Sequence, residues 1–465
     1  RDIEAANAEM ENVTKEIGNL LEKHKDFLSA SDEELSIEVQ KGEIPVRIAN
    51  SEYTFVVDAW VPTGKVDTVK TQLETMVEGI YVEAQETRGR SMKEVEEAEE
   101  RFKDAPTKFN NGKVVKEFEY PTKLVSVPKY QEIDPSILIA IFLPMFFGFM
   151  VGDVGYAIPF IILGAYGLKV THHKDWRAIA TVLFFGGIWA FIFGFFFFGE
   201  CLGMHFVTSP HALDVEWSWE MIATQIFGIE DFHLGPIFDG ILPNDSGIGK
   251  LHDVALLLKL SVYIGIVHLM IGYLCALYNK SIQHGFKHGF MEKGGWILSF
   301  IGLVLVCYAL AMFLIYGTPM DDLMVYLVVG IIVLIVGVVL NFREEKAQAI
   351  LELPGLVGNI LSYTRLAAIG MSKAGMALAF NYIAIEMVGI GLGGIAGAII
   401  GFILFVFLHL MIWTLAILSA GLHGLRLQFV ELMAKFFEGG GVEYNPLKIK
   451  RVKTFSNKEK TTKEV

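Results

Sequence analysis

The chain has 465 residues, of which 53% are hydrophobic, and its formal net charge at pH 7 is −13. This much apolar sequence excludes an ordinary soluble protein and indicates a membrane protein. The three cysteines are too far apart for a disulfide framework or a metal site. The charge is concentrated before residue 136 and in short loops, so it gives no reason to expect a nucleic-acid partner.

Residues 3–27 are predicted to form one strand of a coiled coil, because their apolar positions recur at three-four spacing. The stripe consists of Ile3, Ala6, Met10, Val13, Ile17, Leu20, His24 and Phe27. We expect a partner helix to cover it, supplied by another subunit or by a preceding part of the same protein. The first stretch lacks the apolar core of a signal peptide, which predicts a cytoplasmic location.

A small α/β lobe is predicted next, with a strand at 53–62, a helix at 65–79 and a strand at 80–84. Residues 88–104 are charged and are expected to be solvated. The fold class is therefore an α+β N-terminal part followed by an all-α polytopic membrane domain. We place the domains at 1–130 (cytoplasmic and incomplete), 131–445 (membrane) and 446–465 (a basic cytoplasmic tail).

Eight apolar spans predict about eight membrane helices, and they lie at 136–151, 154–170, 178–200, 253–278, 295–317, 323–341, 353–388 and 395–437. The first two are short for a bilayer that needs about 20 residues, so a re-entrant hairpin around Gly152-Asp153 stays open. The last two, of about 36 and 43 residues, are expected to be strongly tilted or to extend beyond the bilayer.

Basic residues predict the orientation of these helices. They gather in the loops on one side, which we assign to the cytoplasm, and include Lys169, Lys174, Arg177, Lys280, Lys287, Lys293, Arg343, Lys346 and the tail. The loop at 201–249 on the opposite side has no Lys or Arg and is rich in acids. Both chain ends are therefore expected in the cytoplasm.

Two arginines interrupt the last two apolar spans, Arg365 in the seventh and Arg426 in the eighth. An arginine at the centre of a membrane helix costs about 2.5 to 3.5 kcal/mol on insertion scales, and its guanidinium cannot lose its charge. Such residues usually face a partner or a water-filled pathway. The pair therefore indicates ion handling.

The eighth span also carries a half-polar stripe at three-four spacing. Its members are His409, Ile412, Ala416, Ser419, His423, Arg426, Val430 and Met433. Each polar side chain of the stripe could instead be a satisfied core residue that bonds across helices. Asp153 and Glu200 lie at outer helix ends, where a solvated role and a functional role both stay open.

Nucleotide chemistry is not expected in this chain, because it contains no GxxxxGK[ST] sequence. His284 and His288 are four residues apart, but the loop around them offers no further ligands. We therefore expect no metal site and no cofactor.

Several segments resemble the membrane subunit of the archaeal and vacuolar type of rotary ATPase, called subunit I in prokaryotes and subunit a in eukaryotes. They are Ala59-Trp60-Val61-Pro62, Glu132-Ile133-Asp134-Pro135, Gly152-Asp153-Val154-Gly155-Tyr156, the run from Pro354 to Leu366, and Leu422-His423-Gly424-Leu425-Arg426-Leu427. Their order and spacing cover most of the chain. The Ser-Tyr-x-Arg-Leu segment that contains Arg365 is the most specific, and the flanking Pro-Gly-Leu-x-Gly-Asn is similar to prokaryotic members.

The resemblance implies a stator in the cell membrane. Its N-terminal domain would hold peripheral stalks, and its last two helices would lie against a rotating ring of proteolipid subunits that carry ion-binding carboxylates. The central stalk would connect to it only indirectly, through the ring. Two offset half-channels would let the ion reach the ring and leave it. Arg365 matches the family's essential arginine, and Arg426 matches a second arginine on the last helix.

Further ion-pathway residues follow from this comparison. Glu352 precedes Arg365 by thirteen residues, about 20 Å along a helix, and is the candidate for the cytoplasmic half-channel. His423 and Asp153 are candidates for the outer side. Eukaryotic relatives place a histidine where this chain has Lys373, so the outer half-channel is expected to be built differently. Ser419 of the polar stripe and Lys373 are further ion-translocation candidates.

The resemblance also implies an N-terminal segment that this chain lacks, and we expect it to be truncated, degraded or disordered. Two other classes stay open, a secondary ion-coupled transporter and a purely structural membrane scaffold. The transporter is disfavoured because no repeated halves are visible. The transported ion, proton or sodium, and the direction of ATP chemistry are not readable from this subunit.

Overall fold

The structure is a computed structural model of the whole chain, and the residues it describes are 2–44, 49–50, 54–76, 79–85, 105–171, 173–206, 218–219, 248–446 and 451. They divide into two units, Arg1–Glu86 with Tyr444–Val465, and Thr87–Glu443. The stretch predicted to be solvated at 88–104, most of the acidic loop and most of the basic tail lie outside the described residues.

The first unit begins with α1 (Asp2–Glu43), a single helix of 42 residues. The helical part of the coiled-coil prediction is therefore confirmed. Its apolar stripe is open, since Met10 is 67% and Phe27 70% exposed. The partner helix that would cover this stripe stays a prediction.

The predicted α/β lobe is only partly present. A short antiparallel pair is formed by β1 (Ala49–Asn50) and β2 (Phe55–Val56), and α2 (Val66–Met76) follows a 3₁₀ turn at Thr63–Lys65. The strand predicted at 80–84 is wrong, because the described residues 79–85 form no strand. Alternating side chains favour an extended chain, but a strand also needs a neighbouring edge to pair with.

The second unit is built from helices. Its elements are α4 (Lys113–Glu117), α5 (Glu119–Val125), α6 (Ser136–Val151), α7 (Val154–Val170), α8 (Lys174–Phe193), β3 (Glu200–Cys201), β4 (Met204–His205), α11 (Val254–His284), α12 (Phe286–Gly289), α13 (Gly295–Tyr316), α14 (Met320–Glu345), α15 (Ala347–Ser362), α16 (Thr364–Asn381), α17 (Gly394–Arg426) and α18 (Ala434–Phe436). Four π-helical segments extend or join these helices, at Gly194–Phe198, Phe290–Gly294, Tyr382–Ile390 and Leu427–Met433.

Six helices of the described part are long and apolar enough to cross a membrane, by length and composition. They are Lys174–Phe198, Val254–Gln283, Phe286–Leu314, Met320–Arg343, Leu351–Ile390 and Gly394–Phe436. The two shorter apolar helices, α6 and α7, have 16 and 17 residues. The polytopic helical domain is thus confirmed, whereas full crossing by α6 and α7 stays a prediction.

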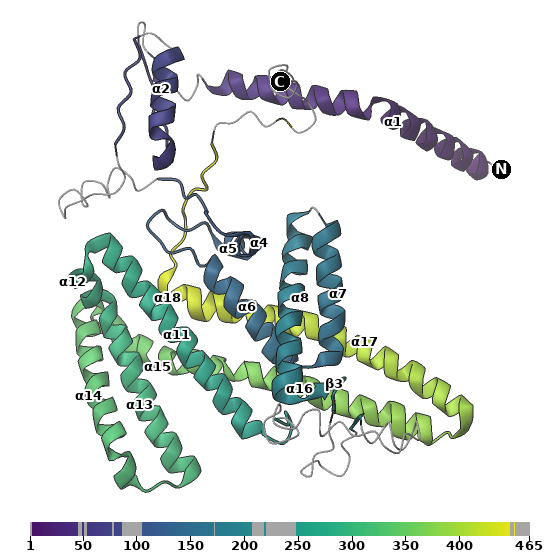
Figure 1. Cartoon of the computed structure of the whole chain (residues 1–465), viewed down its shortest axis with the longest axis vertical. Coiled ribbons are helices and arrows are strands. Elements are labelled where there is room, and N and C mark those ends of the chain that lie inside the picture. The colour runs from purple at the N-terminus through teal and green to yellow at the C-terminus, as the bar shows by residue number, and fades with distance from the viewer. Residues whose placement is uncertain are drawn as a thin grey trace. The chain divides into compact units, whose positions relative to one another are not determined.

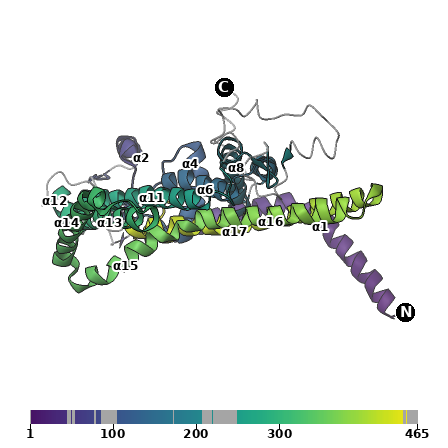
Figure 2. The same cartoon turned by 90° about the horizontal axis from the view of Figure 1, so that it is seen from below.

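Neighbouring helices of the second unit pair closely, α7 with α8 and α13 with α14 (Figure 1). The two longest helices behave differently. The α16 and α17 segments run beside each other and cross the direction of α7 and α8 at a steep angle, and Figure 2 shows them together along one side of this unit. Because they have 40 and 43 residues with their extensions, such an inclination is what a bilayer would require.

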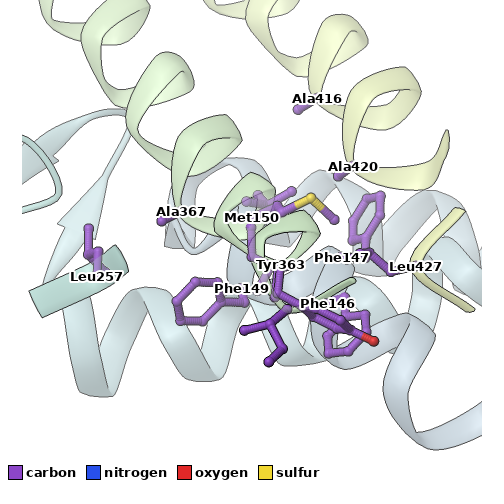
Figure 3. Packing of buried hydrophobic residues seen from close by; sticks show 14 of the residues in the cluster. Phe146, Phe147, Phe149, Met150, Leu257, Tyr363, Ala367, Ala416, Ala420 and Leu427 are labelled. Carbon is purple, nitrogen blue, oxygen red and sulfur yellow. The ribbon is translucent and has the colours of Figure 1, made fainter. Parts of the chain in front are cut away.

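One apolar core joins α6, α11, α16 and α17. Phe146 and Met150 of α6 pack in it with Tyr363 and with Ala420 of α17 (Figure 3). The Phe146 ring meets the Tyr363 ring edge-on, with their centroids 6.1 Å apart. This packing holds α16 and α17 against the rest of the unit at the level of Arg365.

A set of polar contacts, here called the C-terminal contacts, holds the chain where α18 ends. Glu132 accepts backbone hydrogen bonds from Glu438 (3.1 Å) and Gly439 (3.2 Å), and Asn279 of α11 donates to the Phe436 carbonyl (2.9 Å). Lys129 donates to the Glu438 carboxylate at 2.6 Å and lowers the pKa of that group. The C-terminal contacts hold the end of the last span, which carries charged residues of the site.

Candidate functional site

Arg365 lies at a break in the seventh span. Tyr363 separates α15 from α16, and Arg365 is the second residue of α16. Its side chain is 21% exposed, and its Nη1 atom lies 4.0 Å from Oε1 of Glu431. That is too far for a hydrogen bond, and Nη1 makes none within the described part of the chain. The guanidinium is therefore only loosely paired.

Glu431 is the acid of this pair, and the sequence analysis missed it. It is 2% exposed and lies in the π-helical segment Leu427–Met433 that continues α17. Hydrogen bonds of a π-helix run to the fifth residue, so the α-helical register changes there. The predicted polar stripe kept a three-four spacing through Val430, which is 54% exposed, and did not include Glu431.

Arg426 and His423 lie close to the same pair. The charges of both Arg365 and Arg426 act on His423, and both arginines also act on Glu431. The structure thus brings together Arg365, Arg426 and His423 as the sequence predicted, and it adds Glu431. Two fixed cations thus act on one buried acid, and the arginines outnumber it.

Glu352 lies apart from the arginines, on the exposed side of α15. It interacts electrostatically with Lys435 of α18 and with Tyr273 of α11, and Lys435 also interacts with Glu431. A line of charged and polar groups therefore leads from Glu352 toward the Arg365–Glu431 pair.

Asp153 lies in the turn between α6 and α7, near Lys373 in the middle of α16. Gly152 ends α6 in the left-handed conformation, and Asp153 caps α7 by accepting from the Tyr156 amide at 3.2 Å. Its carboxylate also accepts from the amides of Leu202 (2.9 Å) and Gly203 (2.8 Å). The solvated alternative for Asp153 is wrong, because the residue is 0% exposed.

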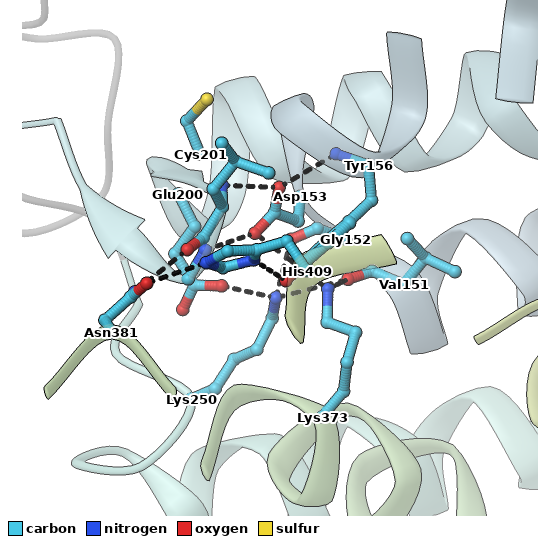
Figure 4. Close-up of polar contacts among 12 residues, drawn as sticks. Val151, Gly152, Asp153, Tyr156, Glu200, Cys201, Lys250, Lys373, Asn381 and His409 are labelled. Carbon is cyan, nitrogen blue, oxygen red and sulfur yellow. Dashed lines mark hydrogen bonds and ion pairs between the residues drawn. The ribbon is translucent and has the colours of Figure 1, made fainter. Parts of the chain in front are cut away.

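Lys373, Lys250 and Glu200 complete a buried ionic network around Asp153 (Figure 4). Lys250 donates to Glu200 at 2.6 Å and to the Gly152 carbonyl at 2.6 Å. Lys373 donates to the Val151 carbonyl and lies 4.0 Å from Asp153. The solvated alternative for Glu200 is also wrong, because it is buried. Two acids and two bases balance, as buried charges require.

A hydrogen-bond chain of uncharged groups extends this network to α17. The Tyr156 hydroxyl lies 2.6 Å from Nδ1 of His409, whose Nε2 lies 2.7 Å from the Asn381 side chain. Asn381 in turn donates to the Leu202 carbonyl at 3.1 Å. His409 is thus a satisfied core residue that ties α7, α16 and α17 together, which agrees with the alternative left open from the sequence.

A cavity of about 380 Å³ opens between α6, α16 and α17. Its polar lining residues are Ser372, Lys373 and Ser419, and the rest of the wall is apolar. The structure therefore brings together Lys373 and Ser419, two of the ion-translocation candidates from the sequence. Ile369, four residues after Arg365, also lines the cavity, which places the cavity along the same face of α16.

Two further functional candidates could not be recognised from the sequence. Lys250 follows an acidic loop and looks like a surface lysine, and its burial depends on the distant turn at Gly152. His268 is a single histidine in an apolar span, where packing is the usual role. A buried lysine or histidine becomes informative only when the groups around it are known.

Comparisons with known proteins agree on one family. A family model described as the V-type ATPase 116kDa subunit family matches residues 9–228 and 353–449. The A-type ATP synthase subunit I of Archaeoglobus fulgidus is 33% identical over 455 residues, which are 91% of this chain and 63% of that protein. The protein of the same name from Halobacterium salinarum is 29% identical, over 94% of this chain and 67% of its own length. The one from Methanocaldococcus jannaschii is 25% identical, over 97% of this chain and 63% of its own length. The chain thus spans about two thirds of the length of these relatives.

Proposed function

The chain belongs to the V-type ATPase 116kDa subunit family, and we propose that it is the membrane stator of a rotary ATPase or ATP synthase. In this role it is a non-catalytic subunit. It supplies two ion half-channels and the arginine that acts on carboxylates of a rotating proteolipid ring. Ion movement is thereby coupled to ATP synthesis or hydrolysis on other subunits.

The observation that carries the proposal is the incomplete pairing of Arg365. A buried permanent cation normally has strong partners, but this guanidinium has one acid at 4.0 Å and a buried nitrogen without a hydrogen bond in the described part. The Arg365 side chain is also 21% exposed. This arrangement suits a cation that receives a second carboxylate from another polypeptide.

The physical effect on such a carboxylate is direct. A nearby positive charge favours the ionised form of an acid, so a ring site that reaches Arg365 releases its proton or sodium ion. Glu431 prevents the cation from being left unpaired between successive ring sites. Arg426 keeps the local charge positive, which blocks a direct leak of cations between the half-channels.

The cytoplasmic half-channel begins at Glu352 in this account. Lys435, Tyr273 and Glu431 continue the polar line from Glu352 toward Arg365. The positive-inside rule places this end of the helices in the cytoplasm together with both chain ends. The membrane is the cell membrane, and the N-terminal unit holds the peripheral stalks.

The outer half-channel runs through the cavity lined by Ser372, Lys373 and Ser419. Asp153 contributes by holding Lys373 in place, because its oxygens are already engaged by backbone amides. The membrane helices contact the ring on the side of α16 and α17. The central stalk is linked to this subunit only through the ring.

Affinity purification distinguishes a stator from a transporter or scaffold that acts alone. A tagged form of the chain, extracted from its native membranes in a mild detergent, is expected to bring down the ring and the peripheral stalk subunits in a fixed ratio. A tagged unrelated polytopic protein from the same membranes is the control. Recovery of the chain by itself, while ring and stalk subunits purify with each other, would contradict the proposal.

A further inference from the structure

His268 occupies an unusual place for a histidine in a membrane helix. It lies on α11, is 0% exposed, and its ring meets the rings of Phe142 and Phe146 edge-on, with centroids 4.4 Å and 4.9 Å apart. Its Nδ1 atom lies 2.6 Å from the hydroxyl oxygen of Tyr363. Since the hydroxyl can donate, Nδ1 is the acceptor when the ring is neutral with the proton on Nε2.

This hydrogen bond reaches the break from which Arg365 projects. Tyr363 is 0% exposed, ends α15 and precedes Arg365 by two residues. Gly265, one turn before His268, leaves room for the Tyr363 ring, because a Cβ atom at Gly265 would lie 2.4 Å from Cγ of Tyr363. Helix α11 therefore contacts Tyr363 at two places, through the hydrogen bond with His268 and through the close approach of Gly265.

The other side of the His268 ring reaches the helix that carries the partner of Arg365. The Gln428 side chain is near the imidazole, and Gln428 is three residues before Glu431. One imidazole therefore stands between the two segments whose side chains form the Arg365–Glu431 pair.

Unpaired polar atoms are concentrated on His268 and on the two segments that form the Arg365–Glu431 pair. Within the described residues, five of the eight buried side-chain atoms that make no hydrogen bond belong to these residues. They are His268 Nε2, Arg365 Nη1, Gln428 Nε2, Gln428 Oε1 and Glu431 Oε2. Buried polar atoms are costly when unpaired, and proteins usually satisfy such clusters with ordered water that bonds two to four of them.

We propose that His268 is a positioning residue for Arg365, which it holds opposite Glu431 through Tyr363 on one side and through Gln428 and ordered water on the other. The proposal rests on the proposed function, in which the position of the guanidinium decides how well a ring carboxylate is bound. His268 itself does not touch the ion or the ring. Its loss lets the break at Tyr363 shift, so that Arg365 meets the ring carboxylate in a less favourable geometry.

The test uses the complete complex in vesicles and measures ATP-driven ion uptake and ATP hydrolysis, both per assembled complex. His268→Ala and Tyr363→Phe are each expected to lower the ratio of uptake to hydrolysis about tenfold, the effect of one lost hydrogen bond near a charge. The double variant is expected to be no worse than His268→Ala, because that substitution alone already removes the contact with Tyr363. His268→Asn, whose side-chain oxygen can replace Nδ1 as acceptor, should restore the ratio to within about threefold of the native value.

Two comparisons separate positioning from packing. Phe142→Leu removes an aromatic neighbour of His268 but no hydrogen bond, and it should leave the ratio unchanged. If His268→Asn were as defective as His268→Ala, the role would be one of packing, and the proposal would be overturned. If His268→Ala does not assemble, Tyr363→Phe decides, since it removes a single oxygen atom; a native ratio in that variant overturns the proposal.

Arg365→Ala, measured in the same vesicles, distinguishes the positioning role of His268 from the proposed function. Native transport in Arg365→Ala refutes the proposed function, whatever His268 does. Loss of transport in Arg365→Ala together with native ratios in both His268→Ala and Tyr363→Phe refutes only the positioning role.

Discussion

Replacing Arg365 with alanine is expected to reduce ATP-driven ion transport of the assembled complex about a hundredfold. The ring carboxylate would lose a charge-assisted contact of roughly 3 kcal/mol, and each 1.4 kcal/mol corresponds to a factor of about ten. Glu431 would also be left buried without its cation. The measurement is ion uptake into vesicles that contain the complete complex, normalised to the amount assembled.

Arg365→Lys tests whether charge alone is sufficient. Lysine keeps the positive charge but lacks the planar fork that can contact two carboxylates at once, so we expect an intermediate loss of about tenfold. Arg343→Ala is the matched control, because Arg343 is an exposed arginine in the last turn of α14, away from the site. Equal losses in Arg365→Ala and Arg343→Ala would show that the effect is not specific to the site.

Lys250→Met is expected to destabilise the membrane domain by about 3–5 kcal/mol, the usual effect of removing one partner from a buried ion pair. Lys250 is 2% exposed and is bonded to Glu200 and to the Gly152 carbonyl, so its loss leaves a carboxylate buried without compensation. The double variant Lys250→Met/Glu200→Gln should recover most of this stability, since no unpaired charge is left. The measurement is the midpoint of thermal denaturation of the purified complex.

The control for the Lys250 and Glu200 variants is Lys169→Met, which removes an exposed lysine near the end of α7. Its effect should stay within about 0.5 kcal/mol, as for most surface substitutions. A double variant as unstable as Lys250→Met alone would mean that the hydrogen bond to Gly152, and not the balance of charges, holds the turn at Asp153.

The helices of the membrane part could be predicted because a long apolar run has few alternatives. The spans at 136–151 and 154–170 agree with α6 and α7 residue for residue, since Pro135, Gly152 and Asp153 mark their ends in the sequence. The strand at 80–84 was wrong because a local pattern says nothing about whether a neighbouring edge exists.

The candidate site was predictable only in part, for a related reason. Arg365, Arg426 and His423 stand out as polar residues in apolar helices, and the structure places them together. Glu431 was missed because the π-helical segment changes the register after Arg426. Lys250 and the burial of Asp153 depend on contacts between residues about fifty to one hundred positions apart, which spacing along one helix cannot reveal.

The proposed contact between Arg365 and the ring is best tested by a density map of the complete membrane complex, with this subunit beside its ring. We expect one ring carboxylate within about 4 Å of the Arg365 guanidinium, with Glu431 on the other side of the cation and the ring against α16 and α17. A ring that packs on another face of the subunit, with Arg365 turned away from every ring carboxylate, would contradict it.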